Sequence, residues 1–180
     1  IETKDEEEER IFRVSLRDGN MTSWAVTGPF TGGVKEIEED PGKMEYLINN
    51  KPWRWMSGSK FIVEPFGYLD LLKLSREIMG EGITSGTSYA RTELYSDEDR
   101  KIRCSLYGEG KLEIMVNGTS IYKSDGIVYD DEITLPLKKG INRILIKVSF
   151  DFPKPYSGRE FGFRLKILEP VKGVWLIGSG

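Results

Sequence analysis

The stretch from residue 125 to 132, DGIVYDDE, places acidic side chains around a tyrosine. Asp125, Asp130 and Asp131 can accept hydrogen bonds from the hydroxyl groups of a sugar. The ring of Tyr129 can lie against the apolar face of a pyranose, where CH groups meet an aromatic surface. The stretch is therefore a candidate carbohydrate site. The alternative is a solvated loop whose tyrosine folds back onto the domain.

The same carboxylates also suit a hard cation, because Ca²⁺ takes oxygen ligands. Asp125, Asp130 and Asp131 are the candidate ligands of a structural Ca²⁺, although their spacing matches no calcium loop. No other cofactor is expected. The chain contains no His, which excludes metals held by histidine and catalytic sites built on Ser-His-Asp or Cys-His.

A second candidate is the tryptophan pair in PWRWM. Trp53 and Trp55 are two positions apart, so on a strand they share one face. If that face is exposed, the pair forms a stacking platform for a polysaccharide. If it faces inward, the pair belongs to the core or to a contact with a partner domain, which the large apolar area of two indoles favours. A run this short does not fix the strand register that decides the question.

Catalysis has little support in the sequence. Glycoside hydrolysis needs two carboxylates placed roughly 5 to 9.5 Å apart. Asp130 with Glu132 is the available pair, and nothing in the spacing of the acids marks it out. Cys104 shares a strand face with Ile102 and Leu106 in KIRCSLY, so we expect a buried structural thiol. We therefore expect no enzymatic activity from this chain alone.

From residue 87 to 168 the sequence reads as a succession of strands. Apolar and polar residues alternate in short runs, and Asn117-Gly118 favours the left-handed backbone of a tight hairpin turn. Such patterning is typical of an all-β fold, an antiparallel β-sandwich or barrel. The residues expected to face the core in the last two strands are Ile144, Ile146, Val148, Phe150, Phe161, Phe163, Leu165 and Ile167.

The first half is less regular. Strands can form at SWAVTGPF, MEYLINN, PWRWM and KFIVEPF, and Trp24 is expected in the core. The segment YLDLLKLSREIMG carries leucines at helical spacing and predicts a short helix.

Counting strand reversals places the candidate residues in space. If each connection from residue 89 onward is a simple reversal, alternate loops fall at opposite ends of the sandwich. One end takes the turns at 97–100, 117–118 and 138–140. The other takes the loops at 108–111, 124–131 and 151–160. The loops at the second end place Glu109, Tyr156 and Arg159 near the acidic stretch. Loops on a rigid sandwich commonly carry binding function, so this end is the preferred ligand-facing edge.

Length and charge set the wider limits. A chain of 180 residues predicts one domain, with an acidic segment and first strand at 1–20, the sandwich at 21–170 and a tail or extra strand at 171–180. Since it starts at Ile1, we expect a piece of a longer protein. No apolar run approaches the ~20 residues of a membrane helix. Residues 1–10 carry net charge −4 and the whole chain −3, so the rest is about +1 and predicts no nucleic-acid partner.

The balance of polar residues points to a thermophile. Gln and His are absent, while Lys, Glu and Arg are abundant. Thermolabile side chains tend to be replaced by surface ion pairs in thermophilic proteins.

Several phrases resemble one recurring module in their order and spacing. They are WAVTGPF, WRW, GYLDL, YARTELYS, MVNGTSIYKSD, LPLKKGINRILIKV and FGFRLKI. The resemblance, over roughly residues 24 to 168, is to galactose-binding-domain-like jelly rolls, close to some carbohydrate-binding and PA14-like modules. Such modules are appended to glycoside hydrolases, polysaccharide lyases and other secreted or surface enzymes.

The resemblance implies a jelly-roll sandwich with one or two short helices and an extracellular or cell-surface location. The function expected from it is that of a non-catalytic accessory module, whose partners are a polysaccharide or oligosaccharide and the neighbouring domains of a larger enzyme. The rival function is a structural domain that mediates contacts between domains or subunits without a small ligand.

Overall fold

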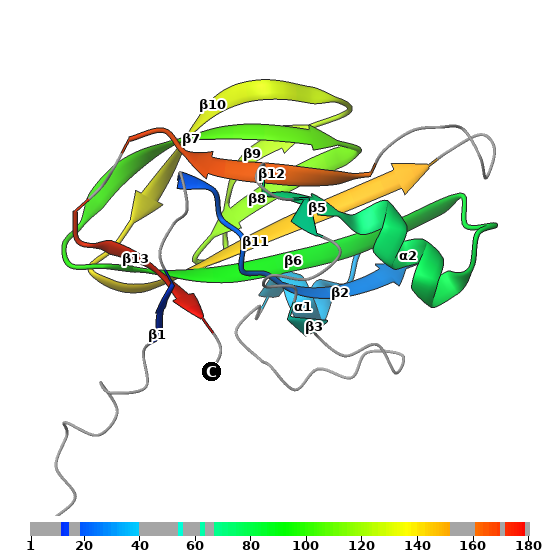
Figure 1. Cartoon of the computed structure of the whole chain (residues 1–180), viewed down its shortest axis with the longest axis horizontal. Coiled ribbons are helices and arrows are strands. Elements are labelled where there is room, and N and C mark those ends of the chain that lie inside the picture. The colour runs from blue at the N-terminus through cyan, green and yellow to red at the C-terminus, as the bar shows by residue number, and fades with distance from the viewer. Residues whose placement is uncertain are drawn as a thin grey trace, which may run out of the picture.

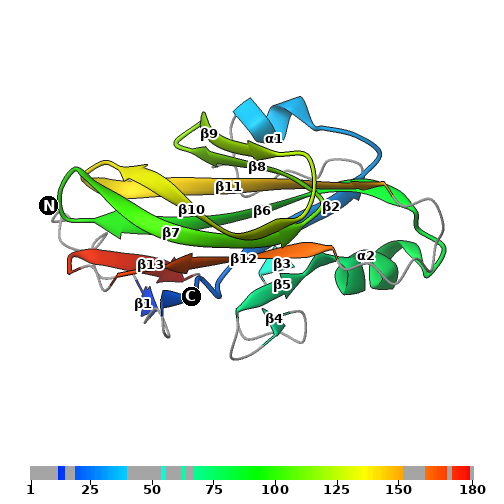
Figure 2. The same ribbon diagram turned by 90° about the horizontal axis from the view of Figure 1, so that it is seen from above.

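The structure is a computed structural model. It describes residues 12–14, 19–39, 54–55, 62–63, 67–151, 161–169 and 172–178. Within these ranges, two antiparallel sheets pack face to face, with a short helix at one end and another outside the larger sheet (Figures 1 and 2). The prediction of an all-β antiparallel sandwich with one or two short helices is confirmed.

The larger sheet, sheet A, has the strand order β1-β13-β6-β11-β8-β9, with β2 also pairing β6 and β3 pairing β2. Its strands are β1 (Phe12–Val14), β2 (Ala25–Phe30), β3 (Arg54–Trp55), β6 (Ser85–Ser96), β8 (Lys111–Val116), β9 (Thr119–Ser124), β11 (Gly140–Asp151) and β13 (Val174–Gly178). Strands β6 and β11 pair along their full lengths and form the centre of the sheet.

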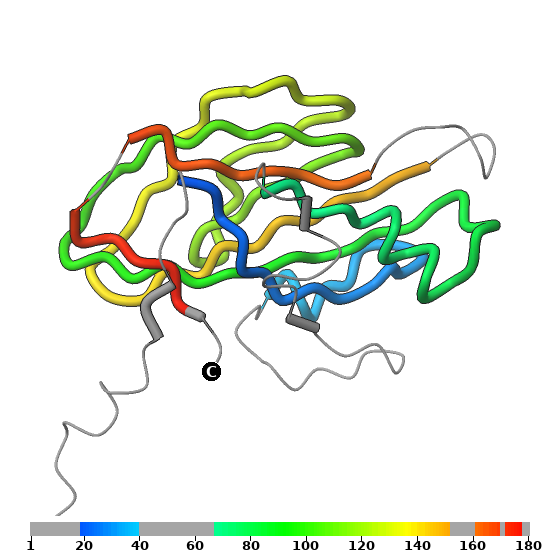
Figure 3. The backbone as a smooth tube through the Cα atoms, in the orientation of Figure 1, coloured from blue at the N-terminus to red at the C-terminus, as the bar shows by residue number. Residues whose placement is uncertain are grey.

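The smaller sheet, sheet B, has the order β10-β7-β12-β5-β4. Its strands are β4 (Ile62–Val63), β5 (Tyr68–Asp70), β7 (Arg100–Glu109), β10 (Val128–Leu137) and β12 (Gly162–Ile167). The chain passes repeatedly from one sheet to the other, as Figure 3 shows, so the connections gather at the two ends of the sandwich.

The core lies between the sheets and follows the alternation of the sequence. All eight residues predicted to face inward from Ile144 to Ile167 are buried, because every second side chain of a strand points to the same face. Trp24 is fully buried, as predicted, and its indole Nε1 donates to the Met21 carbonyl at 2.8 Å. Cys104 is buried as well, and burial raises the pKa of its thiol to about 12.

Helix α2 (Leu71–Met79) confirms the predicted helix and closes one end of the core. The Asp70 carboxylate accepts from the Lys73 backbone N–H at 2.9 Å and satisfies the first turn. The buried face presents leucines to the core, and at the other terminus the Gly80 N–H donates to the Arg76 carbonyl.

Helix α1 (Lys35–Glu39) was not predicted, because its five residues are mostly charged and only Ile37 is buried. In Figure 1 it lies below β6, on the side of sheet A away from sheet B. It completes a second apolar cluster on this outer face, made of Phe30, Val34, Ile37, Tyr89, Met115 and Leu145. The Tyr89 hydroxyl donates to Glu38 at 2.7 Å, and burial raises its pKa well above the usual value. The strand suggested at MEYLINN lies outside the described residues.

The two ends of the sandwich differ. The short-turn end, on the left of Figure 1, holds the turns at 97–99, 117–118 and 138–139. The buried Asn142 ties two of them together, since its Oδ1 accepts from the Lys138 N–H at 2.8 Å and from Asn117 Nδ2 at 2.9 Å. The loop end, on the right, holds the described connections 80–84, 110 and 125–127. No helix in the described ranges is long and apolar enough to cross a membrane.

Candidate functional site

The fold divides the acidic stretch among three places. Asp125 lies in the β9–β10 connection, whereas Tyr129, Asp130 and Asp131 belong to β10. The pairing of β10 with β7 shifts by one residue, so that Tyr129 and Asp130 together lie opposite Tyr107. Two residues facing one on the partner strand constitute a β-bulge, which bends the strand and redirects its side chains.

The bulge depends on an unusual backbone at Asp130. Its φ is 53°, the left-handed conformation that side chains other than glycine seldom adopt and that aspartate tolerates better than most. The carboxylate Oδ1 accepts from the Ser105 hydroxyl at 3.1 Å and forms an ion pair with Arg164. These contacts hold the bulge, and the Tyr129 side chain stands 71% exposed.

A row of aromatic rings crosses the outer face of sheet B from this bulge. The Tyr129 ring centroid is 6.3 Å from that of Tyr107, in an edge-to-face arrangement, and Tyr107 is 5.9 Å from Tyr68. The Arg164 guanidinium carbon lies 5.9 Å from the Tyr107 centroid, within the range of a cation–π contact. The Tyr107 hydroxyl donates to Glu109 at 3.2 Å.

These side chains make up the bulge site, which we define as Tyr129, Asp130, Tyr107, Arg164 and Ser105. It combines an exposed ring with a carboxylate that is itself 60% exposed and a guanidinium beside it. Chemically it can stack on a flat apolar surface and exchange hydrogen bonds with polar groups at the edge of that surface.

Asp131 contacts a different strand from Asp130. Its Oδ2 accepts from the Tyr122 hydroxyl of β9 at 2.8 Å, which joins the edge strands of the two sheets. Burial and the neighbouring carboxylate raise the pKa of Tyr122 to about 12. Asp131 therefore stabilises the sandwich edge and does not join the bulge site.

Asp125, in the connection between the two sheets, lies on the side of sheet A. It borders a hollow of about 210 Å³ on the outer side of sheet A. The hollow is lined by Lys111, Leu112, Glu113, Lys123, Ser124, Asp125, Lys147 and Ser149. Lys147 donates to Glu38 of α1 at 2.7 Å, and Lys123 pairs with Glu113 at 3.2 Å. These ion pairs engage two of the lysines around Asp125.

The calcium site stays a prediction, and the three candidate aspartates lie in different surroundings. Asp130 is held by Arg164 and Ser105, Asp131 by Tyr122, and Asp125 borders the hollow beside sheet A. Among the residues that the structure describes, no group of three or more His, Cys, Asp or Glu side chains is placed to hold a metal ion.

Three of the predicted site residues, Tyr156, Arg159 and Trp53, lie outside the described residues, so their role stays a prediction. Trp55 is placed only by its backbone, which pairs with Ala25 at the margin of sheet A. Glu109, which was also predicted at the loop end of the sandwich, accepts from the Tyr107 hydroxyl.

The sequence did not indicate Tyr107, Ser105 and Arg164 as members of the bulge site. Alternation in KIRCSLY does place Ser105 and Tyr107 on the face away from the core. What the sequence does not reveal is the bulge, which sets Tyr129 and Asp130 against that face, or the pairing of β12 that brings Arg164 to Tyr107.

Comparison with known proteins concerns the fold. No protein-family model matches the sequence, and no curated protein matches it. A solved β-glucosidase from Kluyveromyces marxianus is similar over 88% of this chain and 19% of its own, with a TM-score of 0.50 and 13% identity. This chain thus spans about a fifth of that enzyme.

Smaller proteins are similar as well. A family 35 carbohydrate binding module from an environmental isolate is similar over 65% of this chain and 82% of its own, with a TM-score of 0.40 and 13% identity. The PA14 domain of the MpAFP antifreeze protein is similar over 54% of each chain, with a TM-score of 0.37 and 13% identity. The predicted resemblance to accessory β-sandwich modules is confirmed at the level of the fold.

Proposed function

We propose that this chain is a non-catalytic β-sandwich module that binds carbohydrate at the bulge site. The observation that carries the proposal is the Tyr129 ring, 71% exposed on a strand and braced edge-on by Tyr107. A braced ring has little freedom to lose on binding, so stacking against a sugar costs little conformational entropy.

The polar neighbours of the ring suit the same ligand. Asp130 can accept hydrogen bonds from sugar hydroxyls, and Arg164 can donate them. The two side chains hold each other in place through their ion pair, and the Ser105 hydroxyl also donates to Asp130. Asp130 is thus paired with a cation and a hydroxyl, and we assign the site to binding.

The wider role follows from the ligand. A module of this kind serves as an accessory domain of a larger secreted or surface enzyme, with a polysaccharide and the neighbouring domains as its partners. The names of the family 35 carbohydrate binding module and the β-glucosidase agree with this class of ligand, but their likeness to this chain is one of fold. The proposal rests on the bulge site.

Affinity electrophoresis through gels containing xylan, β-glucan, galactomannan or pectin tests the proposal. We expect one or more of these polysaccharides to retard the wild type, and Tyr129→Ala to weaken the binding by about tenfold. Ile127→Ala is the matched control, because Ile127 is also exposed (53%) and lies just before β10. Both variants should melt like the wild type, since neither side chain is buried.

Equal retardation of the wild type and Tyr129→Ala would remove the bulge site from consideration. Migration unaffected by every polysaccharide would favour the rival function, a structural domain that meets other domains or subunits.

A further inference from the structure

A second group of partly exposed apolar side chains lies on the outer face of sheet A at the short-turn end. Trp175 of β13 is paired with Tyr95 of β6, and Tyr95 is paired on its other side with Ile141 of β11. The Trp175 and Tyr95 ring centroids are 5.3 Å apart with 36° between the planes, and Ile141 is 52% exposed. We name these three residues the platform.

Strand alternation sets the direction of the platform. Leu94 and Leu176, next to Tyr95 and Trp175, are buried in the core, and so is Ile144, an odd number of positions from Ile141. Because side chains alternate along a strand, Tyr95, Trp175 and Ile141 point the other way. The outer cluster that α1 completes lies farther along the same strands, at Tyr89 and Leu145. The platform is thus separate from that cluster, and it lies on the opposite sheet from the bulge site.

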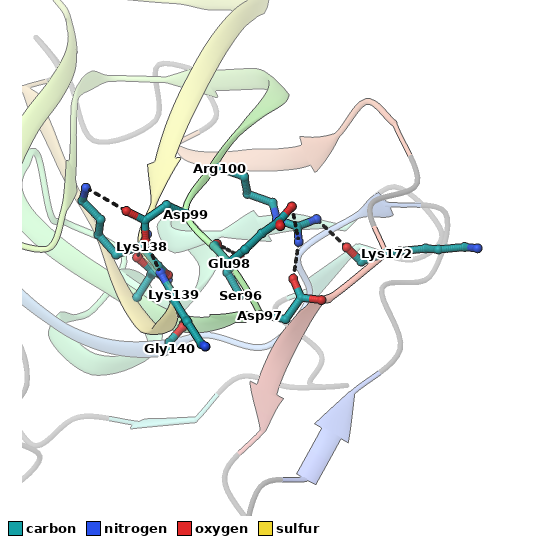
Figure 4. Close-up of polar contacts among 10 residues, drawn as sticks. Ser96, Asp97, Glu98, Asp99, Arg100, Lys138, Lys139, Gly140 and Lys172 are labelled. Carbon is teal, nitrogen blue, oxygen red and sulfur yellow. Dashed lines mark hydrogen bonds and ion pairs between the residues drawn. The ribbon is translucent and has the colours of Figure 1, made fainter.

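A clamp of polar contacts fixes the strands beneath the platform (Figure 4). The Asp97 N–H donates to the Gly173 carbonyl at 2.9 Å, which joins the end of β6 to the start of β13. Arg100 pairs with the Asp97 carboxylate and donates to the Lys172 carbonyl at 2.5 Å. Gly173 has a φ of 78° and no side chain, which leaves room for the Asp97 carboxylate. The Trp175 and Tyr95 rings are therefore held side by side before any ligand arrives.

Polar groups border the platform. In the next row along the strands, Arg143 Nε donates to Glu93 at 3.2 Å, and the two side chains are 55% and 34% exposed. Rings bordered by such donors and acceptors suit a ligand with an apolar face and a polar edge, as a pyranose has. The surface of three residues is also small compared with the roughly 800 Å² that each partner buries in a stable protein interface.

We propose that Trp175, Tyr95 and Ile141 form a second carbohydrate-binding surface, which stacks on a pyranose ring while Glu93 and Arg143 bind its hydroxyls. The inference takes its class of ligand from the proposed function, but it uses none of the residues of the bulge site. Two sites on opposite faces let one module contact two polysaccharide chains, or one chain twice, and so gain avidity.

Two platform variants test the inference. Trp175→Ala removes the larger ring, and Ile141→Asp places a charge at an exposed position without disturbing the packing of β13. Leu168→Ala is the matched control, because Leu168 is an exposed apolar residue (40%) at the end of β12, outside the platform. The probes are insoluble cellulose and xylan in pull-down assays, and cellohexaose and xylohexaose in titrations followed by tryptophan fluorescence.

We expect the wild type to bind one of these probes, the two platform variants to bind it about fivefold more weakly, and the control to bind it like the wild type. In a Tyr129→Ala background, Ile141→Asp should abolish the remaining binding. Ile141→Asp should melt like the wild type, so a loss of binding there cannot come from unfolding.

Three results would overturn the inference. The first is unchanged binding in both platform variants, and the second is complete loss of binding in Tyr129→Ala alone, which would leave the bulge site as the sole ligand surface. The third is a wild-type dimer in sedimentation that Ile141→Asp dissociates, with sugar binding intact. Binding that Tyr129→Ala leaves unchanged and Ile141→Asp removes would instead support the platform and contradict the bulge site.

Discussion

At the scale of single residues, Asp130 explains how an ordinary edge strand presents an exposed ring. Its left-handed backbone creates the bulge, and its carboxylate binds the two side chains that secure it, Ser105 and Arg164. The sequence indicated Tyr129 and Asp130 as candidates because of their residue types. It did not reveal that Asp125 borders a hollow beside sheet A or that Asp131 accepts from Tyr122, because these placements depend on which strands become neighbours.

The backbone role of Asp130 can be separated from its side-chain role. Asp130→Ala removes the contacts and leaves a residue poorly suited to a positive φ, whereas Asp130→Gly removes the same contacts but suits that backbone. We expect Asp130→Ala to lower the free energy of unfolding by about 1 kcal/mol more than Asp130→Gly does. Urea denaturation of both variants measures the difference, and equal losses would show that backbone strain plays no part.

Because of Cys104, we expect the stability of the fold to fall at alkaline pH. Its thiol has a pKa of about 12 in the folded chain against an ordinary value of 9.0, so above pH 9 the unfolded state loses the proton that the folded state keeps. Stability from this group is complete below pH 9 and is lost as pH rises toward 12.

The expected slope is about 1.4 kcal/mol of unfolding free energy per pH unit once the unfolded thiol has ionised. Urea denaturation at pH 8, 9 and 10 should show this fall in the wild type and a flatter profile in Cys104→Ala, whatever its starting stability. Tyr89 and Tyr122, whose pKa values are also raised, add their own loss only above pH 10, the ordinary pKa of tyrosine. Parallel profiles for the two proteins would contradict the assignment.

Among the strands and helices, the sequence predicted those features that depend on a pattern within one segment. Alternation in INRILIKVSF predicted the inward face of β11, and the leucines of YLDLLKLSREIMG predicted α2. Helix α1 was not predicted, because its five residues carry little apolar signal. Its Ile37 packs against residues of β6, β8 and β11. The bulge in β10 was not predicted either, because a shift of register depends on how two strands pair and not on the sequence of one of them.

The short-turn end depends on Asn142, whose amide serves several turn groups at once. It accepts from Lys138 and Asn117, and its Nδ2 donates to the Lys138 carbonyl at 2.7 Å and the Gly140 carbonyl at 3.1 Å. Asn142→Ala leaves these groups without a partner in a fully buried position. We expect a loss of about 2–3 kcal/mol in unfolding free energy, against less than about 0.5 kcal/mol for the exposed neighbour in Ile141→Ala.

Chemical denaturation of the two variants side by side measures this prediction. A loss in Asn142→Ala no larger than that in Ile141→Ala would mean that water replaces the amide, and the buried network would then not be what fixes the turns.

At the scale of the whole molecule, two sheets place two aromatic surfaces on opposite faces. Sheet B carries the bulge site toward the loop end, and sheet A carries the platform at the short-turn end. Reversal counting predicted which connections share an end, and the described turns at 97–99, 117–118 and 138–139 do lie together. The counting also favoured loop tips as the binding edge, whereas the exposed ring of the bulge site stands on the sheet beside them.

Carbohydrate binding on the outer face of sheet B, at the bulge, can be tested residue by residue. The most direct measurement is a titration of ¹⁵N-labelled chain with cellohexaose and xylohexaose, followed by two-dimensional amide spectra. We expect a first group of saturating shifts at Ser105, Tyr107, Tyr129, Asp130 and Arg164, and we expect Tyr129→Ala to lose this group. Shifts confined to residues elsewhere, or unchanged at the bulge in Tyr129→Ala, would contradict it.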